Sequence, residues 1–270
     1  MKAVILGAGR GSRMGEVTAD RPKCLIEIDG RSLLDRQCAA FRAAGFEDIG
    51  VVTGWQAERF TNLPVTLFHN PFWAGTSMVD SLACARRWLT AGPVVACYGD
   101  ILVTPADIQL VARSAAMIAM AFDPNWLSQW SRRFTDPLQD AETLRLDADG
   151  NVTEIGGKPG SLTEIEGQYL GLIKLEPAGW ARLDAAIARV GRRDMTGTLA
   201  RLVASDPAAV QGVAIRGPWH EFDSARDLAT GYDVVTQIDR LLSDVVEDRA
   251  ERGVSGRGER RQGRLDGGSG

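Results

Sequence analysis

Short apolar runs alternate with helical patterns along the first hundred residues. The apolar runs are four or five residues long and end near turn residues, which is the pattern of buried strands. Between several of them, apolar side chains recur at helical spacing, and Ser32 and Gly45 are placed to cap and to stop one such helix. We expect strands at 3–6, 25–28, 49–53, 65–69 and 94–98, and helices at 32–44, 56–60 and 77–89. This alternation predicts an α/β fold with a mainly parallel sheet and helices on both faces.

The pattern is less regular after Asp100. An irregular segment, 126–137, separates two expected strands, and Asp149-Gly150 is a hairpin turn signal. Strands are expected at 117–122, 142–147, 152–155, 168–175 and 210–215, and helices at 177–190, at 196–204 and after the cap Ser224. We expect these elements to extend the first sheet, so that residues 1–250 form one domain.

The C-terminal part of the chain divides into a helix and a tail. Residues 233–252 repeat apolar side chains at helical spacing and predict an amphipathic helix. Its apolar face is expected to pack on its own domain, with a contact in a homodimer as the alternative. Residues 253–270 are rich in Gly, Arg, Ser and Glu, a composition that cannot support a core, and we expect them to be disordered.

Composition narrows the class of protein. The net charge of −4 over 270 residues argues against broad binding to nucleic acid or to an anionic membrane, which needs a dense Lys/Arg surface. The four cysteines show no C-x-x-C spacing, and the chain has only two histidines that could join them as zinc ligands. Reduced core thiols are therefore favoured over a zinc site or disulfides. No apolar run has the length of a signal peptide core or a bilayer span, and we expect a cytoplasmic protein.

A glycine-rich loop, 7–13, follows the first expected strand and carries the first candidate chemistry. Its glycines let backbone amides approach phosphate oxygens, although such a loop can also be a tight turn without a ligand. Its spacing is neither a dinucleotide fingerprint nor a P-loop. Arg13 and Lys23, the latter in Arg21-Pro22-Lys23, add two cations that suit a triphosphate whose pyrophosphate must leave. These residues favour a nucleoside-triphosphate site.

With these motifs the chain resembles the nucleotidyltransferase superfamily that activates sugar phosphates and phospho-alcohols, whose signature is a Gly-rich loop, an Arg and a Pro-Lys pair. The resemblance extends from Met1 to about Asp233. It implies the MobA-like or sugar-phosphate nucleotidyltransferase fold, which is Rossmann-like and GT-A-like, with a mixed sheet. It further implies that residues 1–115 bind the nucleotide, that residues 116–232 bind the acceptor, and that the loop and Lys23 contact the triphosphate.

The resemblance also implies a magnesium site. The family places one aspartate just after the fourth main strand and another late in the chain, and Asp100 and Asp223 match those positions. Hard carboxylate oxygens suit Mg²⁺, which would bridge the α-phosphate. A solvated surface role is the alternative for a single Asp, but both residues end apolar strands. An acceptor that is already an anionic phosphate or phosphonate needs no general base.

The nucleotide-binding residues that the resemblance implies come from five short segments of the first half of the chain. Ser77 and Ser81 are candidates for reading a pyrimidine edge, with capping of their own helix as the alternative. The full set is Leu6, Ala8, Gly9, Gly11, Ser12, Arg13, Lys23, Gly54, Ser77, Ser81 and Gly99.

Three segments in the second half of the chain narrow the range of candidate acceptors. Residues 136–142, 155–159 and 166–171 resemble the cytidylyltransferases of phosphonate biosynthesis, often fused to phosphoenolpyruvate mutase, and phosphocholine cytidylyltransferases share the layout. The resemblance implies CTP as donor and a small phosphonate, such as 2-aminoethylphosphonate, or a phospho-alcohol, such as phosphocholine, as acceptor. Lys158 joins Arg13 and Lys23 as a candidate catalytic residue, because it could grip the acceptor's phosphoryl group; an exposed loop lysine is the alternative.

The acceptor-binding set adds carboxylates and aromatic rings that could receive an ammonium group, since aromatic faces attract cations by roughly 0.5 to 2 kcal/mol each. The set is Trp130, Lys158, Glu166, Tyr169, Asp194 and Trp219. Each aromatic could instead be core. Burial of the aromatics would favour the runner-up function, a sugar-1-phosphate nucleotidyltransferase. A non-catalytic nucleotide-binding regulator is a third reading, against which the joint presence of Lys23, Asp100 and Asp223 argues.

Overall fold

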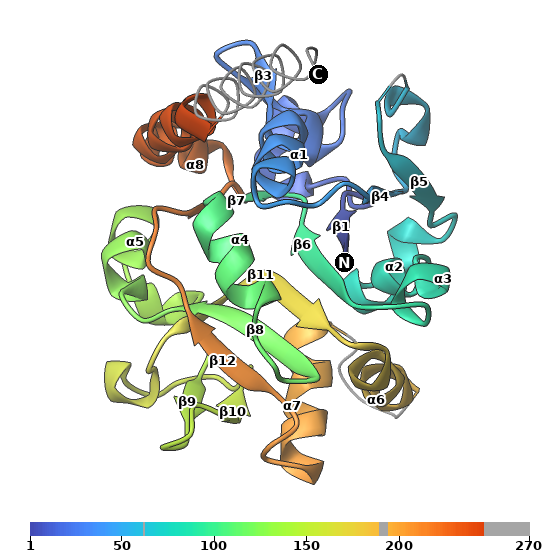
Figure 1. Ribbon diagram of the computed structural model, residues 1–270. Helices are drawn as coiled ribbons and strands as arrows, with labels where there is room; N and C mark the ends of the chain where they lie inside the picture. The colour runs from blue at the N-terminus through green and yellow to red at the C-terminus, as the bar shows by residue number, and fades with distance from the viewer. Residues whose placement is uncertain (62, 189–193, 246–270) are drawn as a thin grey trace, which may run out of the picture.

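A seven-stranded sheet forms the centre of the protein. The computed structural model describes residues 1–61, 63–188 and 194–245 (Figure 1). The strand order is β12-β8-β11-β6-β1-β4-β5. All neighbouring pairs are parallel except those of β11, which is antiparallel to β6 and to β8. The bounds are β1 Lys2–Leu6, β4 Ile49–Thr53, β5 Thr66–His69, β6 Val94–Tyr98, β8 Ile118–Asp123, β11 Gln168–Leu175 and β12 Gln211–Ala214. The expected mainly parallel mixed sheet is confirmed.

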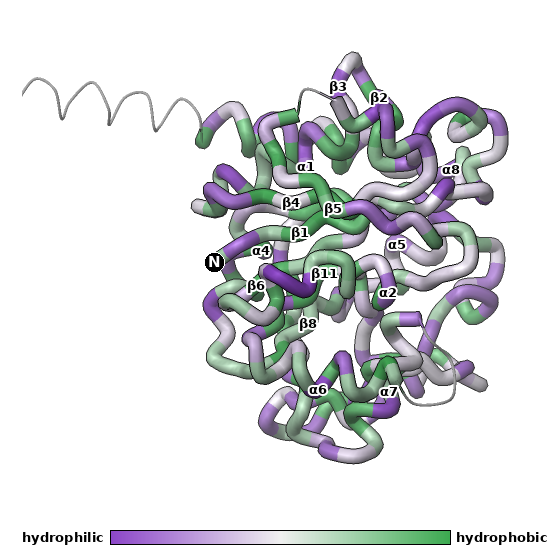
Figure 2. Tube along the Cα trace, turned by 90° about the vertical axis from the view of Figure 1, so that its right-hand side faces the viewer, coloured by the Kyte–Doolittle hydropathy of each residue, from purple (hydrophilic) through white to green (hydrophobic). Residues whose placement is uncertain are grey.

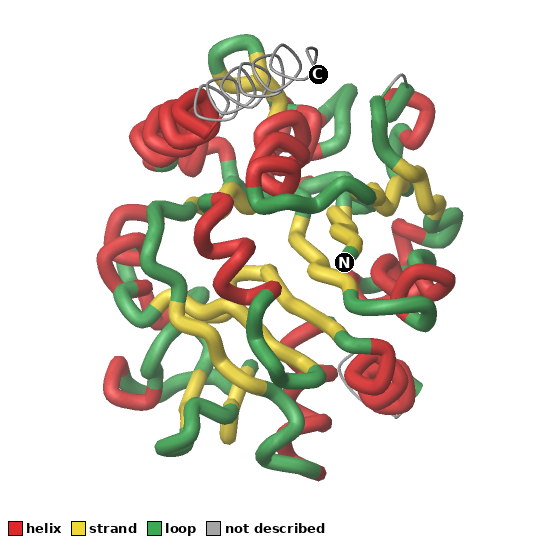
Figure 3. The backbone as a smooth tube through the Cα atoms, in the orientation of Figure 1, coloured by secondary structure: helices red, strands yellow, loops and turns green. Residues whose placement is uncertain are grey.

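Helices cover both faces of this sheet. Successive side chains of each strand point to opposite faces, so one strand contributes to two core clusters. In β1, Ala3 and Ile5 belong to one core cluster and Val4 and Leu6 to the other. The first cluster includes side chains of α1 (Leu33–Ala43), α4 (Pro105–Ala112) and the helix at 232–245, and the second those of α2 (Met78–Ala83), α6 (Pro177–Ile187) and α7 (Met195–Ser205). Figure 3 shows the helices around the strands, and in Figure 2 β1 and β4 are coloured mostly as hydrophobic.

Two helix starts follow their predicted caps. Ser32 accepts a hydrogen bond from the Asp35 amide at 3.0 Å and begins α1, which ends before Gly45 with its positive φ of 96°. Ser224 caps α8 (Ala225–Thr230) in the same way. A further helix spans 232–245, so the first part of the predicted C-terminal helix is confirmed. The rest of that helix and the predicted tail, 253–270, lie outside the described residues.

Several expected elements are shorter or broken. The strand expected at 25–28 is the 3₁₀ turn η2 (Lys23–Leu25) and then β2 (Glu27–Ile28), which pairs with β3 (Arg31–Ser32). The helix expected at 77–89 is divided into α2 and α3 (Arg86–Leu89), and the one at 56–60 is the 3₁₀ turn η3 (Ala57–Arg59).

The segment expected to be irregular contains a helix instead. α5 (Trp126–Arg133) buries Trp126, Gln129, Trp130 and Arg133, a spacing of three and four residues that places them on one helical face. Two small sheets flank the main one, β9 (Leu144–Leu146) with β10 (Val152–Ile155), and β7 (Ile101–Leu102) with β13 (His220–Glu221). Within the described ranges, no helix has the length and apolar character needed to cross a membrane.

Candidate active site

A cavity of about 260 Å³ lies at the carboxyl ends of β1 and β6, where ligands bind in sheets of this kind. The glycine loop, η1 (Ser12–Thr18) and η2 form much of its wall. Its lining residues are Leu6, Gly7, Gly9, Gly11, Ser12, Arg13, Lys23, Cys24, Met78, Gly99, Asp100 and Asp223. The cavity therefore brings together both predicted metal ligands and most of the predicted nucleotide-binding residues.

Two glycines allow the walls of this cavity to approach one another. Gly11 has a φ of +71°, and a Cβ there would lie 2.7 Å from Cε of Lys23. The Gly99 amide donates to the Leu6 carbonyl at 3.1 Å, and a Cβ on Gly99 would lie 2.7 Å from that oxygen. Both distances are shorter than real Cβ contacts, so glycine is required for this packing.

Charged side chains from distant parts of the chain meet in the cavity. Nζ of Lys23 lies 2.8 Å from Oδ2 of Asp100 and 2.7 Å from Oδ1 of Asp223. Arg13 contacts the other oxygen of Asp223 at 2.6 Å. Burial by itself lowers the pKa of Lys23, but the attraction of Asp100 and Asp223 outweighs it and raises that pKa. Lys23 is therefore a permanent cation between the two carboxylates.

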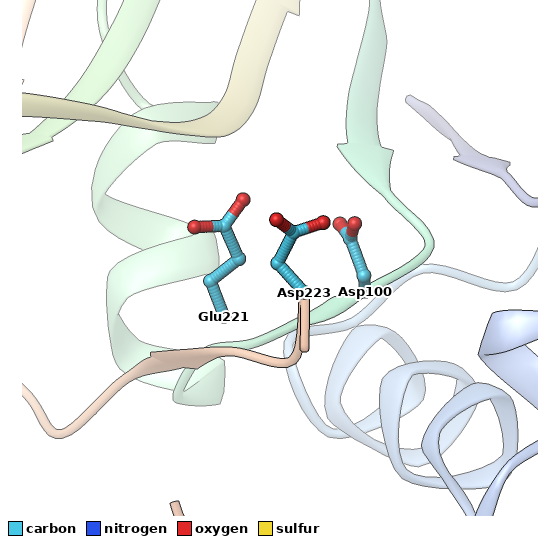
Figure 4. Close-up of side chains that lie close together, drawn as sticks. All are labelled: Asp100, Glu221 and Asp223. Carbon is cyan, nitrogen blue, oxygen red and sulfur yellow. The ribbon is translucent and has the colours of Figure 1, made fainter. Parts of the chain in front are cut away.

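Glu221 is a third carboxylate at this position, and it was not among the residues predicted. One oxygen of each of Asp100, Glu221 and Asp223 lies within 4.8 Å of the others. Figure 4 shows the three side chains next to one another, with Asp223 in the middle. The signal in the sequence was the spacing, since residues two apart in an extended segment share a face. Loss of hydration raises the pKa of Glu221 to about 7, although Arg133 opposes this rise.

The carboxylate cluster fits a divalent cation. Asp100 is 8% exposed, and its Oδ1 is buried and has no hydrogen-bond partner among the described residues. Such an orphaned acceptor is costly unless a ligand satisfies it. The donor set consists of hard carboxylate oxygens, which suit Mg²⁺.

Four predicted nucleotide-binding residues lie outside the cavity lining. The Ala8 carbonyl accepts from the Trp55 amide at 3.0 Å, and Gly54 packs against the same oxygen, so both stabilise the loop. Ser77 contacts Asp80 as the cap of α2, and Oγ of Ser81 accepts from Asn70 at 3.0 Å. The structure thus gives Ser77 the capping role that was the alternative to reading a base edge.

The predicted acceptor aromatics are mainly core residues. Trp130 is 4% and Trp219 is 5% exposed. Their ring centroids lie 6.2 Å apart, and Nε1 of Trp219 donates to Asp123 at 2.9 Å. Tyr169 is half-buried and packs edge-on against Tyr98 at 5.9 Å. Both indoles are more than nine-tenths buried, and burial against one another stabilises them more than an exposed position would.

The polar acceptor candidates also have partners within the protein. Nζ of Lys158 donates to the carbonyls of Leu138 and Gln139 at 3.0 and 2.8 Å. Glu166 accepts from the Leu146 amide at 3.0 Å, and Asp194 accepts from the Gly197 amide at 2.7 Å as the cap of α7. These contacts stabilise loops and a helix end rather than leaving the side chains directed at a ligand.

Known proteins resemble this chain in sequence and in fold. The family model described as the MobA-like NTP transferase domain matches residues 3–205. A CTP:phosphoglutamine cytidylyltransferase of Campylobacter jejuni is 31% identical over 249 residues, 84% of this chain and 98% of that protein. A 2-aminoethylphosphonate cytidylyltransferase of Lancefieldella rimae is 31% identical over 39% of this chain and 45% of its own. The solved inositol-1-phosphate CTP transferase of T. maritima shares the fold, with a TM-score of 0.69 at 17% identity over 90% of this chain and 95% of that one.

Proposed function

Since the chain belongs to the MobA-like NTP transferase family, we propose that it is a Mg²⁺-dependent cytidylyltransferase. It transfers CMP from CTP to a small phosphorylated or phosphonate acceptor and releases pyrophosphate. The observation that carries this proposal is the meeting of Lys23, Asp100 and Asp223 beside the glycine loop. The choice of CTP is supported by the 31% identity to a cytidylyltransferase over nearly that protein's whole length.

The reaction needs positioning and charge stabilisation rather than a side-chain nucleophile. An anionic oxygen of the acceptor forms a bond to the α-phosphorus of CTP, and the α–β anhydride bond breaks, leaving its electron pair on pyrophosphate. The backbone of the glycine loop orients the triphosphate, and Arg13 and Lys23 stabilise the charge that develops on the leaving group. No proton has to be removed from the acceptor, so the cavity requires no general base.

Asp100, Asp223 and Glu221 are the residues that would hold Mg²⁺. When bound, the metal neutralises charge on the phosphates and orients them for in-line attack. Lys23 contacts two of these carboxylates in the free protein, and the triphosphate offers it a competing anionic partner. Nucleotide binding would therefore release the carboxylates for the metal.

The acceptor that we propose is a small phosphorylated or phosphonate compound. The two named relatives act on phosphoglutamine and on 2-aminoethylphosphonate, and phosphocholine is a further candidate from the sequence resemblance. Burial of Trp130 and Trp219 favours the runner-up, a sugar-1-phosphate nucleotidyltransferase, because these two rings are not exposed to receive an ammonium group. The 31% identity to a cytidylyltransferase over 84% of this chain outweighs that observation.

Pyrophosphate release tests the proposal. Each of CTP, UTP, ATP and GTP is paired with phosphoglutamine, 2-aminoethylphosphonate, phosphocholine, inositol-1-phosphate and glucose-1-phosphate. We expect turnover with CTP and one of the first three acceptors, and only in the presence of Mg²⁺. Turnover confined to glucose-1-phosphate with another nucleotide would establish the runner-up, and the absence of any CTP-dependent release would refute the proposal.

A further inference from the structure

Arg133 is a buried cation beside the carboxylate cluster but outside the cavity. It belongs to α5, and its side chain is 2% exposed. Nη1 donates to Oε2 of Glu221 at 2.7 Å, and Nε donates to Oδ1 of Asp227 at 2.8 Å. A buried guanidinium is retained only where carboxylates compensate its lost hydration, and Arg133 has two.

Asp227 connects this cation to the backbone of the cluster. Its Oδ2 accepts from the Asp223 amide at 3.1 Å and from the Ser224 amide at 2.7 Å. The intervening residue is also fixed, since the Phe222 amide donates to the Asp100 carbonyl at 2.8 Å. The segment 221–223 is therefore held by Arg133 at one end, by Asp227 at the other, and by Asp100 between them.

The three cations near the cluster have different partners. Lys23 and Arg13 line the cavity, where phosphates compete for them, whereas Arg133 is directed at Glu221 and Asp227 and does not line it. Without Arg133, the side chain of Glu221 would have no described cation to hold it beside two other carboxylates, and like charges repel.

We propose that Arg133 is a positioning residue for the metal site. It holds the Glu221 carboxylate next to Asp100 and Asp223, and through Asp227 it fixes the backbone at Asp223, so that the cluster binds a divalent cation with three carboxylates. This inference rests on the proposed function only in that the bound cation serves nucleotide transfer.

Arg36 offers a matched control for a purely structural role. Its side chain is 1% exposed, and it donates to both oxygens of Asp239, at 3.0 Å from Nε and 2.7 Å from Nη2, joining α1 to the helix at 232–245. None of its described partners belongs to the carboxylate cluster. Loss of either arginine removes a buried ion pair, so general destabilisation should affect both variants alike.

The test titrates Mn²⁺ into the protein without nucleotide or acceptor and follows free Mn²⁺ by electron paramagnetic resonance. We expect Arg133→Gln to weaken Mn²⁺ binding by about tenfold to a hundredfold, the range for residues that orient metal ligands. Arg36→Gln should lower the melting temperature but leave Mn²⁺ binding within about twofold of the wild type. Equal Mn²⁺ affinity in wild type and Arg133→Gln, or equal weakening in both arginine variants, would overturn the proposal.

A double-mutant cycle shows whether Arg133 acts through Glu221. Glu221→Gln should weaken Mn²⁺ binding, and adding Arg133→Gln should then weaken it by less than about a further threefold. If Arg133→Gln does not fold, Arg133→Lys replaces it, since Lys keeps one charge but cannot form the two-sided contact. Unchanged Mn²⁺ binding in Glu221→Gln contradicts the proposal. A wild type that binds Mn²⁺ but does not turn over CTP would refute the proposed function alone.

Discussion

The two halves of the predicted site differ in how their side chains are used. On the donor side, Arg13, Lys23, Asp100 and Asp223 meet in one cavity with contacts of 2.6 to 2.8 Å. On the acceptor side, Trp130 and Trp219 are buried, and Lys158 donates to backbone carbonyls. The donor-side charges surround a cavity and indicate chemistry, whereas the acceptor-side candidates have partners inside the protein and indicate structural roles.

The difference has a physical cause. Asp100 and Asp223 each lie two residues after a strand, β6 and β13, and the pairing of β13 with β7 brings both carboxylates to the cavity. Acceptor candidates lie in α5 and in loops, where they contact other parts of the protein: Trp130 packs against Trp219, and Lys158 donates to the carbonyls at 138 and 139. Burying an indole contributes more than about 2 kcal/mol, which exceeds the gain from one exposed cation contact.

Removing a donor-side carboxylate should have the largest effect. Asp100→Asn and Asp223→Asn each lose a hard anionic ligand and leave Lys23 with one carboxylate, so we expect kcat to fall by about a thousandfold or more, corresponding to about 4 kcal/mol. Steady-state pyrophosphate release measures this loss. Asp239→Asn, whose carboxylate pairs with Arg36 instead, should stay within about threefold. Near-normal turnover in either cavity variant would remove that residue from the metal assignment.

Lys23→Met should separate two roles of one cation. We expect kcat/KM for CTP to fall by about a hundredfold, because a preorganised charge at the phosphates is lost. Binding of Mn²⁺ by the free protein should become tighter, because Nζ no longer occupies Asp100 and Asp223. Steady-state kinetics and Mn²⁺ titration measure the two effects. Weaker Mn²⁺ binding in this variant would show that Lys23 supports the metal site rather than competing for it.

His220, on the strand β13 that carries Glu221, predicts a pH effect on stability. Burial, assisted by Arg133 and opposed by Asp227, lowers the pKa of His220 to about 4 from its ordinary 6.5. The unfolded chain therefore binds this proton first as the pH falls, so stability present above pH 6.5 is lost towards pH 4. We expect His220 to contribute a loss of about 2 kcal/mol between pH 7 and pH 5, measured by urea unfolding as the change in the stability difference between the wild type and His220→Gln. The raised pKa of Glu221 acts in the opposite direction in both proteins and cancels from this difference. A stability difference that does not change with pH would contradict the prediction.

Lys158→Ala should have the smallest effect and tests the acceptor side directly. Nζ of Lys158 contacts two carbonyls of an exposed loop, and such hydrogen bonds contribute about 1 kcal/mol of loop stability. We expect kcat/KM for the acceptor to change by less than about threefold. A loss of kcat/KM as large as that expected for Lys23→Met would show that Lys158 binds the acceptor's phosphoryl group. The donor and acceptor halves of the site would then differ less than the contacts indicate.

Much of the fold followed from apolar runs bounded by turn residues. The strands at 49–53, 94–98 and 168–175 have the predicted bounds, and Ser32 and Ser224 cap the predicted helices. The helix α5 was missed because it is only eight residues long, although its buried side chains recur at helical spacing. Arg133 was missed because a single charged residue reveals nothing of its partner 88 positions away, whereas Glu221 could have been predicted from its spacing of two residues from Asp223.

Phosphorus-31 NMR of the reaction tests directly whether the protein transfers CMP from CTP to the acceptor. The wild-type protein is mixed with CTP, Mg²⁺ and the acceptor that supports turnover, alongside Asp100→Asn. In the wild-type reaction we expect equal amounts of free pyrophosphate and a new phosphoanhydride linking CMP to the acceptor to replace CTP, whereas Asp100→Asn should leave CTP intact. Hydrolysis of CTP without a linked product, or product formation by Asp100→Asn at the wild-type rate, would contradict this expectation.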